Sequence, residues 1–339
     1  MKVSIGYHIQ SGAWGGGNQF ALNLSKALVS RGHTVTFNLA DNDIDIILLT
    51  DPRGNSHNVS FGPGPILRYL LFRNSRAIVI HRINECDERK STRFMNRLLY
   101  RSNYLSDHTV FIAAWLKDLP VWTRESPSSI ILNGADQSIF KARPHSKWDR
   151  IEKLRLVTHH WGPNIMKGFD IYRLLDDMMS DPYWKNLISF TYIGNLPPGF
   201  SFHNTQYVPP LSGNQLASEL SRHHVYLTAS INEPAGMHHI EGALCGLPLL
   251  YRISGALPEY CSNFGIGFTP STFETALSTL MLQYDSYYSR MSSYPHTAHV
   301  MCNHYISLAE SLHARSSEIL LRRNLLRNPL LFVRNLISS

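Results

Sequence analysis

Two glutamates stand on either side of a glycine-containing turn in the stretch INEPAGMHHIEGALCGLPLL at 231–250. The apolar pattern predicts a strand, then the turn, and then a helix that starts near Met237. The free N–H groups and positive dipole end of a helix start can bind a diphosphate. A carboxylate next to such a dianion would be repelled. We therefore expect Glu233 and Glu241 to lie to either side of it and to accept hydrogen bonds from sugar hydroxyls.

Two further segments carry residues that chemistry could use. The segment VIHRINECDERK at 79–90 leaves a predicted strand end with a dense set of polar groups. With 17 histidines in the chain, most of them must be bystanders. The glycine-rich segment SGAWGGGNQF at 11–20 lies between a strand and a helix. It fails as a dinucleotide-binding fingerprint, because Phe20 stands where the third glycine is required.

Short apolar runs alternate with helical patterns along the chain, which is typical of βαβ units and a parallel sheet. A first series of strands is predicted at 3–7, 34–39, 44–49, 77–81, 109–113 and 129–133. A second series is predicted at 154–160, 189–194, 205–209, 225–229 and 247–251. Helices are predicted at 18–32, 168–180, 214–222, 237–245 and 273–285, and one long helix from about 298. The fold class is therefore α/β, with two doubly wound, Rossmann-like domains that face each other across a cleft.

The alternation of strand and helix patterns stops around 140–153, where the chain is polar and interrupted by Pro144. The predicted organisation is an N-terminal Rossmann-like domain at 1–145, a C-terminal Rossmann-like domain at 146–310 and a basic amphipathic helix at 311–339. Pro329 is expected to kink or stop that helix, which we expect to cross back to the first domain. Its arginines and leucines leave two interpretations open: a helix packed on the body with a solvated basic face, or peripheral contact with an anionic membrane.

The composition fits a globular protein, with 43% hydrophobic and 17% charged residues. Lys and Arg number 32 against 25 Asp and Glu, and this surplus favours anionic partners without choosing among them. The four cysteines form no CxxC pair, so a zinc site and a disulfide framework both fail on spacing. No signal peptide or membrane-spanning run is present, which predicts a cytoplasmic protein, with attachment to the inner face of the membrane as a further option.

Several segments together resemble the retaining glycosyltransferases of family 4, which have the GT-B fold. Glu233 and Glu241, with seven residues between them, resemble that family's E-x7-E motif. CGLPLL (245–250) and SGALPEY (254–260) resemble the "cGxPvv" and "GGxPE" segments that follow it. ILNGADQSIF (131–140) resembles the strand and turn at the domain junction, and MKGFDIYRLL (166–175) resembles "KGxdxLixA". An isolated pair of glutamates is more often solvated; the surrounding segments favour the functional interpretation.

The resemblance implies a donor site for a nucleotide-diphosphate sugar. Glu233 would bind the donor sugar, Glu241 the ribose, and Lys167 the phosphates, where its charge would neutralise the leaving group. The backbone of Gly236, Met237 and His238 would hold the diphosphate. Such enzymes use Lys, Arg and helix dipoles in place of a divalent ion, so neither a metal nor a cofactor is expected.

The sequence departs from the family at one point. An Arg usually stands a few residues before the phosphate-binding Lys, whereas this chain has THHWGPN at 158–164. Either a histidine of this segment, His159 or the candidate donor-binding residue His160, replaces that Arg as a weaker phosphate donor, or Arg252 or another cation reaches in.

The first domain also carries implied roles. Gly15, Gly16 and Gly17 match the family's N-terminal "GG" loop, which approaches the donor phosphates and the acceptor. His81 stands where the family often has an active-site histidine. Arg82, Asn84 and Glu85 are candidates for binding the acceptor, although no spacing rule supports them.

The expected activity is retaining transfer of a sugar to a glycan or a lipid-linked acceptor, in cell-surface polysaccharide or glycolipid synthesis. The alternative is a non-catalytic relative that binds nucleotide sugars or glycans. Intact Glu233, Glu241 and Lys167 argue against that alternative, while the missing Arg argues for it. A nucleic-acid binder, suggested by positive charge alone, is not expected, because the basic residues are dispersed and no nucleic-acid motif is present.

Overall fold

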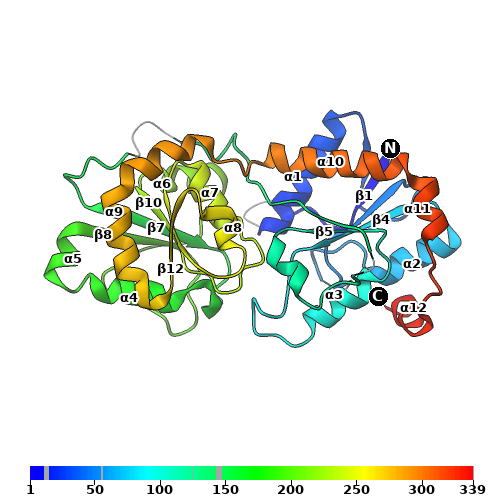
Figure 1. The fold of residues 1–339 in the computed structure, drawn as a ribbon, viewed down its shortest axis with the longest axis horizontal. Helices are drawn as coiled ribbons and strands as arrows, with labels where there is room; N and C mark the ends of the chain where they lie inside the picture. Colours follow the sequence, from blue (N-terminus) through cyan, green and yellow to red (C-terminus); the bar gives the residue numbers. More distant parts are fainter. Residues whose placement is uncertain (11–14, 55, 125, 143–146, 339) are drawn as a thin grey trace. The chain divides into compact units, whose positions relative to one another are not determined.

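The computed structural model describes residues 1–339 apart from 11–14, 55, 125, 143–146 and 339. The chain forms two compact units (Figure 1). Unit 1 consists of Met1–Asn133 and Ala298–Ser339, and unit 2 of Gly134–Thr297. The chain thus changes unit at 133/134 and 297/298 rather than at the expected 145/146 and 310/311. The polar segment that suggested the first boundary lies inside unit 2, because the chain leaves unit 1 soon after its last strand.

Unit 1 is built on a six-stranded parallel sheet with the order β2-β1-β3-β4-β5-β6. The strands are β1 Lys2–Ile5, β2 Thr34–Thr36, β3 Ile46–Leu49, β4 Ile78–Ile83, β5 His108–Phe111 and β6 Ser128–Ile130. The helices are α1 Gly16–Ser30, α2 Pro63–Phe72, α3 Met95–Asn103, α10 Ala298–Ala314, α11 Ser316–Arg322 and α12 Pro329–Leu336, with the 3₁₀ helix η1 at Ala114–Asp118. All six strands predicted for this half of the chain are confirmed.

The unit 1 sheet is covered on both faces, as a parallel sheet requires. Successive residues of a strand point to opposite faces, and β3 illustrates this. Ile46 and Leu48 pack in one core cluster with side chains of α1 and α10. Ile47 and Leu49 pack in a second cluster with side chains of α2, and α12 contributes partly buried residues to it.

Unit 2 contains a second six-stranded parallel sheet, with the order β12-β11-β10-β7-β8-β9. The strands are β7 Leu154–His160, β8 Ile188–Gly194, β9 Gln206–Val208, β10 Val225–Thr228, β11 Leu249–Arg252 and β12 Gly265–Phe268. The helices are α4 Phe169–Met178, α5 Pro182–Leu187, α6 Gly213–Leu220, α7 His238–Leu244, α8 Leu257–Cys261 and α9 Phe273–Arg290, with 3₁₀ helices η3 Ile165–Lys167, η4 Pro270–Thr272 and η5 Met291–Ser293. The five strands predicted here are confirmed, and β12 is additional.

The two faces of the unit 2 sheet also carry different helices. Val225 and Leu227 of β10 pack in the main core cluster with residues of α4, α5 and α9. Tyr226, between them, points to the other face and lies against α7. A Cβ atom added to Gly242 of α7 would fall 2.2 Å from the Tyr226 ring. This glycine therefore lets α7 pack close to the central strands, whose carboxyl ends carry the candidate site.

The prediction of one long C-terminal helix is wrong. The segment forms three helices, with breaks at Arg315 and between α11 and α12. Pro329 does not stop a helix but begins one: it occupies the first turn of α12, and Asn328 caps that turn by accepting a hydrogen bond from the Leu331 N–H. A proline is tolerated at this position because its missing N–H would have no intrahelical partner. The expected return to the first domain is confirmed, since α10, α11 and α12 all belong to unit 1.

Within the described ranges, no helix combines the length and the apolar character needed to cross a membrane.

Candidate active site

The carboxyl ends of β7 and β10 bring two loops of unit 2 together. The strands are neighbours in the parallel sheet, so their following loops emerge at the same edge. The loop after β7 contains η3, and the loop after β10 leads to α7. They are joined by a backbone hydrogen bond, 2.8 Å long, from the Ile231 N–H to the Met166 carbonyl. This edge is where ligands bind in doubly wound sheets.

Gly168 is the residue that allows the two loops to approach so closely. Its φ is +99°, in the left-handed region that glycine favours. A Cβ atom added here would lie 2.4 Å from both the Cβ and the carbonyl oxygen of Ala229. Only glycine fits, and its neighbour Lys167 is thereby held over the loop that follows β10.

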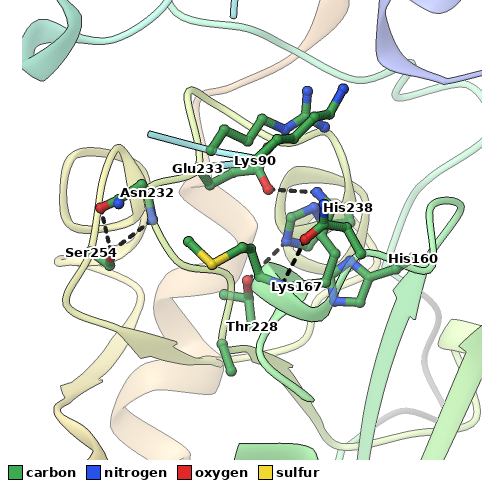
Figure 2. Close-up of polar contacts among 12 residues, drawn as sticks. Lys90, His160, Lys167, Thr228, Asn232, Glu233, His238 and Ser254 are labelled. Atoms are coloured by element: carbon green, nitrogen blue, oxygen red, sulfur yellow. Dashed lines mark hydrogen bonds and ion pairs between the residues drawn. The ribbon is translucent and has the colours of Figure 1, made fainter. Parts of the chain in front are cut away.

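Lys167 and Glu233, both predicted site residues, form an ion pair at this edge. Lys167 Nζ lies 2.6 Å from Glu233 Oε2, and the side chains are 13% and 3% exposed. Figure 2 shows this pair together with Thr228, His160 and His238. A buried, hydrogen-bonded pair of opposite charges fixes where both side chains point.

Glu241, the second predicted glutamate, is paired with a histidine that the sequence analysis did not assign. His159 Nε2 lies 2.7 Å from Glu241 Oε2, and the His159 ring is also 3.0 Å from the Tyr226 hydroxyl through its other nitrogen. The ion pair thus links Glu241, on α7, to the end of β7. The two residues are far apart in the sequence, and only the sheet brings them together.

His160, the next residue of β7, is buried. Its Nε2 is 2.7 Å from the Tyr172 hydroxyl, and its ring centroid lies 4.6 Å from that of His238. Burial, followed by the positive charge of Lys167, holds the pKa of His160 well below 6.5. The ring is therefore neutral at neutral pH, so His160 does not supply the positive charge of the family's missing Arg.

Arg252, the other cation considered for that role, donates to the Ala229 carbonyl at 3.5 Å and is paired with a carboxylate. Its Nη1 lies 2.8 Å from Asp170 Oδ2, near the start of α4. Lys167 is therefore the predicted cation that the structure places beside Glu233.

The turn before α7 is shaped by its own side chains. Met237 is the N-cap residue of α7, and the first turn of the helix follows at His238. His238 Nε2 is hydrogen-bonded to Thr228 Oγ1 at 2.9 Å, so its ring points down toward β10. Burial is the main cause that holds its pKa well below 6.5. A Cβ atom on Gly236 would fall 2.4 Å from the His238 ring, so glycine leaves the room that this ring needs.

His81 occupies the middle of a separate polar cluster in unit 1. It lies on β4 and is fully buried, with Nδ1 3.1 Å from Asn103 Nδ2. Its Nε2 has no hydrogen-bond partner among the residues that the structure describes. Burial lowers the pKa of His81 to about 3, so the ring is neutral.

The candidate acceptor residues follow His81 on the same strand and its loop. The Cζ atom of Arg82 lies 4.0 Å from the centroid of the Phe20 ring, and the Arg82 guanidinium donates a hydrogen bond to Asn133 Oδ1 at 2.9 Å. The Asn84 side chain accepts from Arg82 Nη1 at 2.7 Å in the amide orientation that satisfies both of its ends. Glu85 is buried and forms ion pairs with the two basic residues that follow it, Arg89 at 2.9 Å and Lys90 at 3.4 Å.

The predicted glycine loop is described only in part, because residues 11–14 lie outside the described ranges. Gly15 is the N-cap residue of α1, and Gly16 and Gly17 begin the helix. A Cβ atom on Gly17 would lie 3.1 Å from the Tyr7 ring, a tight contact that glycine avoids.

Outside the undescribed positions, no group of three or more His, Cys, Asp or Glu side chains is arranged to hold a metal ion. That the protein works without a metal stays a prediction.

Comparisons of the chain with family models and with curated proteins found no match. Comparison with solved structures did. A sucrose-phosphate synthase from Thermosynechococcus elongatus matches over 92% of this chain and 99% of its own, with 14% identity and a TM-score of 0.65. HepE from Anabaena in complex with UDP-glucose matches over 92% and 100%, with 14% identity and a TM-score of 0.63. A glycosyltransferase from Rickettsia africae matches over 95% and 99%, with 12% identity and a TM-score of 0.62.

This chain has the GT-B fold. The two parallel sheets with their flanking helices match these structures over nearly the whole of both chains, which confirms the predicted fold class. At 12–14% identity the likeness concerns the fold alone.

Proposed function

We propose that this protein is a retaining glycosyltransferase that moves a sugar from a nucleotide-diphosphate donor to a glycan or lipid-linked acceptor. One observation carries the proposal: Lys167 and Glu233 meet at 2.6 Å at the carboxyl ends of β7 and β10, beside the first turn of α7. A cation, a carboxylate and a helix start are the groups that a phosphate-linked sugar requires.

In this proposal the ion pairs hold the donor-binding groups ready. A diphosphate gives Lys167 a second anionic partner, and the Glu233 oxygens accept hydrogen bonds from the donor sugar. Glu241, held by His159, accepts from the ribose hydroxyls. The backbone N–H groups of Gly236, Met237 and His238 face the diphosphate at the start of α7, where the dipole favours negative charge. The two ion pairs fix the side chains of Lys167, Glu233 and Glu241, so little ordering of these groups is required when a donor binds.

The chemistry assigned to these groups is electrostatic. The bond between the anomeric carbon and the leaving phosphate oxygen breaks as the acceptor hydroxyl bonds to the same face. The hydroxyl proton passes to the leaving phosphate, which balances the step. Lys167 stabilises the charge that develops on that phosphate, in a site where burial strengthens the interaction. We propose that Lys167 and the start of α7 serve where other transferases use a metal ion.

For the acceptor we propose the polar cluster of unit 1. His81, Arg82, Asn84 and Glu85 lie on β4 and the loop after it, again at a carboxyl edge of a parallel sheet. The buried, neutral ring of His81 has an unpartnered nitrogen among the described residues, which suits a hydrogen bond to a sugar hydroxyl. Gly15, Gly16 and Gly17 are proposed to approach the donor phosphates and the acceptor through their backbone.

Thermal stabilisation by nucleotides tests the donor site directly. UDP is the first nucleotide to try, because the similar HepE was solved with UDP-glucose. At about 100 times its dissociation constant, a ligand specific to the folded state stabilises by about 2.7 kcal/mol, which raises the melting temperature. GDP and ADP are measured in parallel. If no nucleoside diphosphate or its sugar stabilises the protein, the donor site is refuted.

Two substitutions separate binding from chemistry. Lys167→Ala should lower kcat by about 10²–10³, since it removes the charge that stabilises the leaving phosphate. Glu241→Ala should weaken donor binding by about 10- to 100-fold, the worth of hydrogen bonds to a charged group. Lys185→Ala, at an exposed lysine of α5, is the matched control and should change neither.

The stereochemistry and the metal requirement are tested with the wild-type protein. NMR of the product should show the anomeric configuration of the donor, and EDTA should leave the rate unchanged. A donor that binds but is never consumed, with any glycan or lipid-linked acceptor, would identify a binding protein instead of an enzyme.

A further inference from the structure

The C-terminal helix α12 carries apolar side chains on two of its sides, and the chain covers only one of them. Leu331, Phe332 and Leu336 pack against a core cluster of unit 1. On the other side Leu330, Val333 and Ile337 are 60%, 52% and 77% exposed. Their spacing of three and four residues aligns them in one stripe along the outer face. Exposed apolar side chains that gather in one patch mark a site of interaction with another protein or with a membrane.

Two neighbouring helices of unit 1 extend this exposed apolar surface. α12 packs against α2 and α3 (Figure 1). Arg68 of α2 donates to the Leu336 carbonyl at 2.8 Å, and the Asn335 side chain donates to the Arg101 carbonyl of α3 at 3.0 Å. Phe72, at the end of α2, is 77% exposed, and Tyr100 of α3 is also exposed. We call the outer faces of α2, α3 and α12 the three-helix surface.

Positive charge is in excess on the segments that form this surface and on the neighbouring helix α11. The segments 63–76, 95–103 and 315–339 contain ten arginines and one acidic residue, Glu318, and so carry +9. The whole chain carries +7, so the remaining residues sum to −2. The basic residues are dispersed along the chain, but the fold brings ten arginines together on three adjoining segments.

Several of these arginines are held by groups that do not cancel their charge. Arg68, Arg73, Arg101 and Arg327 donate to backbone carbonyls. In the described part of the chain, only two of these arginines form ion pairs with carboxylates: Arg322 with Glu318, and Arg323 with Asp107. Burial and the like charges of Arg334 and Arg97 lower the pKa of Arg101. An anion at this surface would relieve that repulsion.

We propose that the three-helix surface docks on an anionic lipid membrane. Exposed arginines alone would suit any polyanion, and exposed leucines alone would suit any apolar partner. Their alternation on α12, with Arg334 between Val333 and Ile337, fits the boundary between lipid headgroups and acyl chains. The surface lies in unit 1, and the inference does not depend on the proposed sugar transfer.

Vesicle co-sedimentation of the full chain tests this inference. The protein should bind vesicles that contain phosphatidylglycerol and phosphatidylcholine, should not bind phosphatidylcholine alone, and should be released by high salt. The double variant Arg97→Gln/Arg334→Gln should bind about 30-fold more weakly, because each arginine near an anionic surface contributes about 1 kcal/mol. The triple variant Leu330→Ser/Val333→Ser/Ile337→Ser should also lose binding, since it removes the exposed stripe.

The control variant Leu282→Ser/Arg290→Gln changes an exposed leucine and an exposed arginine of α9 in unit 2. It should bind vesicles as the wild type does. Unchanged melting temperatures and unchanged stabilisation by UDP would show that the variants are folded with an intact donor site. No binding to anionic vesicles, equal binding to both vesicle types, or equal loss in the control overturns the inference. The inference is also overturned if sedimentation shows that a second copy of the chain covers this surface, or if a mobility-shift measurement shows that nucleic acid does.

Discussion

His239 makes the stability of unit 2 sensitive to acid. It lies on α7 and is fully buried, with its ring 5.2 Å from that of Tyr260 and 5.1 Å from that of His238. Neither ring nitrogen has a hydrogen-bond partner among the described residues. Burial lowers the pKa of His239 to about 3, well below its ordinary value of 6.5. The substitution that tests this is His239→Leu, which has a similar volume and does not titrate.

The sign follows from the two protonation states. Between about pH 6.5 and pH 3 the unfolded chain binds a proton at this position and the folded chain does not, so stability falls as the pH falls. At about pH 5, one and a half units below the unfolded pKa, the loss is about 2 kcal/mol, at 1.36 kcal/mol per unit. Above about pH 7.5 the loss is close to zero.

The assay is urea denaturation of both proteins at about pH 7.5 and about pH 5. Between these two pH values, the free energy of unfolding of His239→Leu should fall by about 2 kcal/mol less than that of the wild type. A change in packing contributes equally at both pH values and cancels, and so do the other histidines. His203→Leu, at an exposed position of the same unit, should respond to acid as the wild type does. If His239→Leu loses as much stability as the wild type, the buried neutral ring is not the cause.

Two further substitutions test how the fold is held. Gly168→Ala should destabilise by about 1–3 kcal/mol and weaken donor binding, since its Cβ atom would meet Ala229; Gly199→Ala, also at positive φ but in open space, should leave donor binding unchanged. Arg323→Met should cost about 3–5 kcal/mol in urea denaturation, because it breaks a buried pair with Asp107, whereas Arg322→Met should cost under about 1 kcal/mol. Equal donor affinity in the two glycine variants, or equal cost in the two arginine variants, would contradict these expectations.

Much of the fold follows from the sequence, because buried parallel strands are continuous apolar runs. β3 and the first half of β4 are such runs, and both strands were predicted. β12 was not, since its segment GIGF is half glycine and forms a strand only beside β11. α2 was also missed, because its first turn holds the two prolines of PGPILRYLLF. The three C-terminal helices depend on packing against unit 1, which periodicity does not reveal.

The candidate site was predictable where its groups are close in the sequence or belong to a recognisable segment. Glu233, Glu241 and Lys167 are of this kind. The partner of Glu241 was not, because it depends on which residue at the end of β7 faces α7. Adjacent strand residues point in different directions, so His159 reaches Glu241 while His160 is buried against Tyr172. The surface formed by α2, α3 and α12 was hidden for a similar reason, since its arginines come from three separate segments.

Unit 1 is discontinuous in the chain, and this affects how it can be made. Met301, Tyr305 and Ile306 of α10 belong to the same core cluster as β1 and α1. During synthesis that cluster stays open until the whole of unit 2 has left the ribosome. Unit 2 is a single continuous stretch and can complete its sheet earlier. The half of the protein that begins first is therefore the half that finishes last, and its exposed core is the part that a chaperone would need to protect.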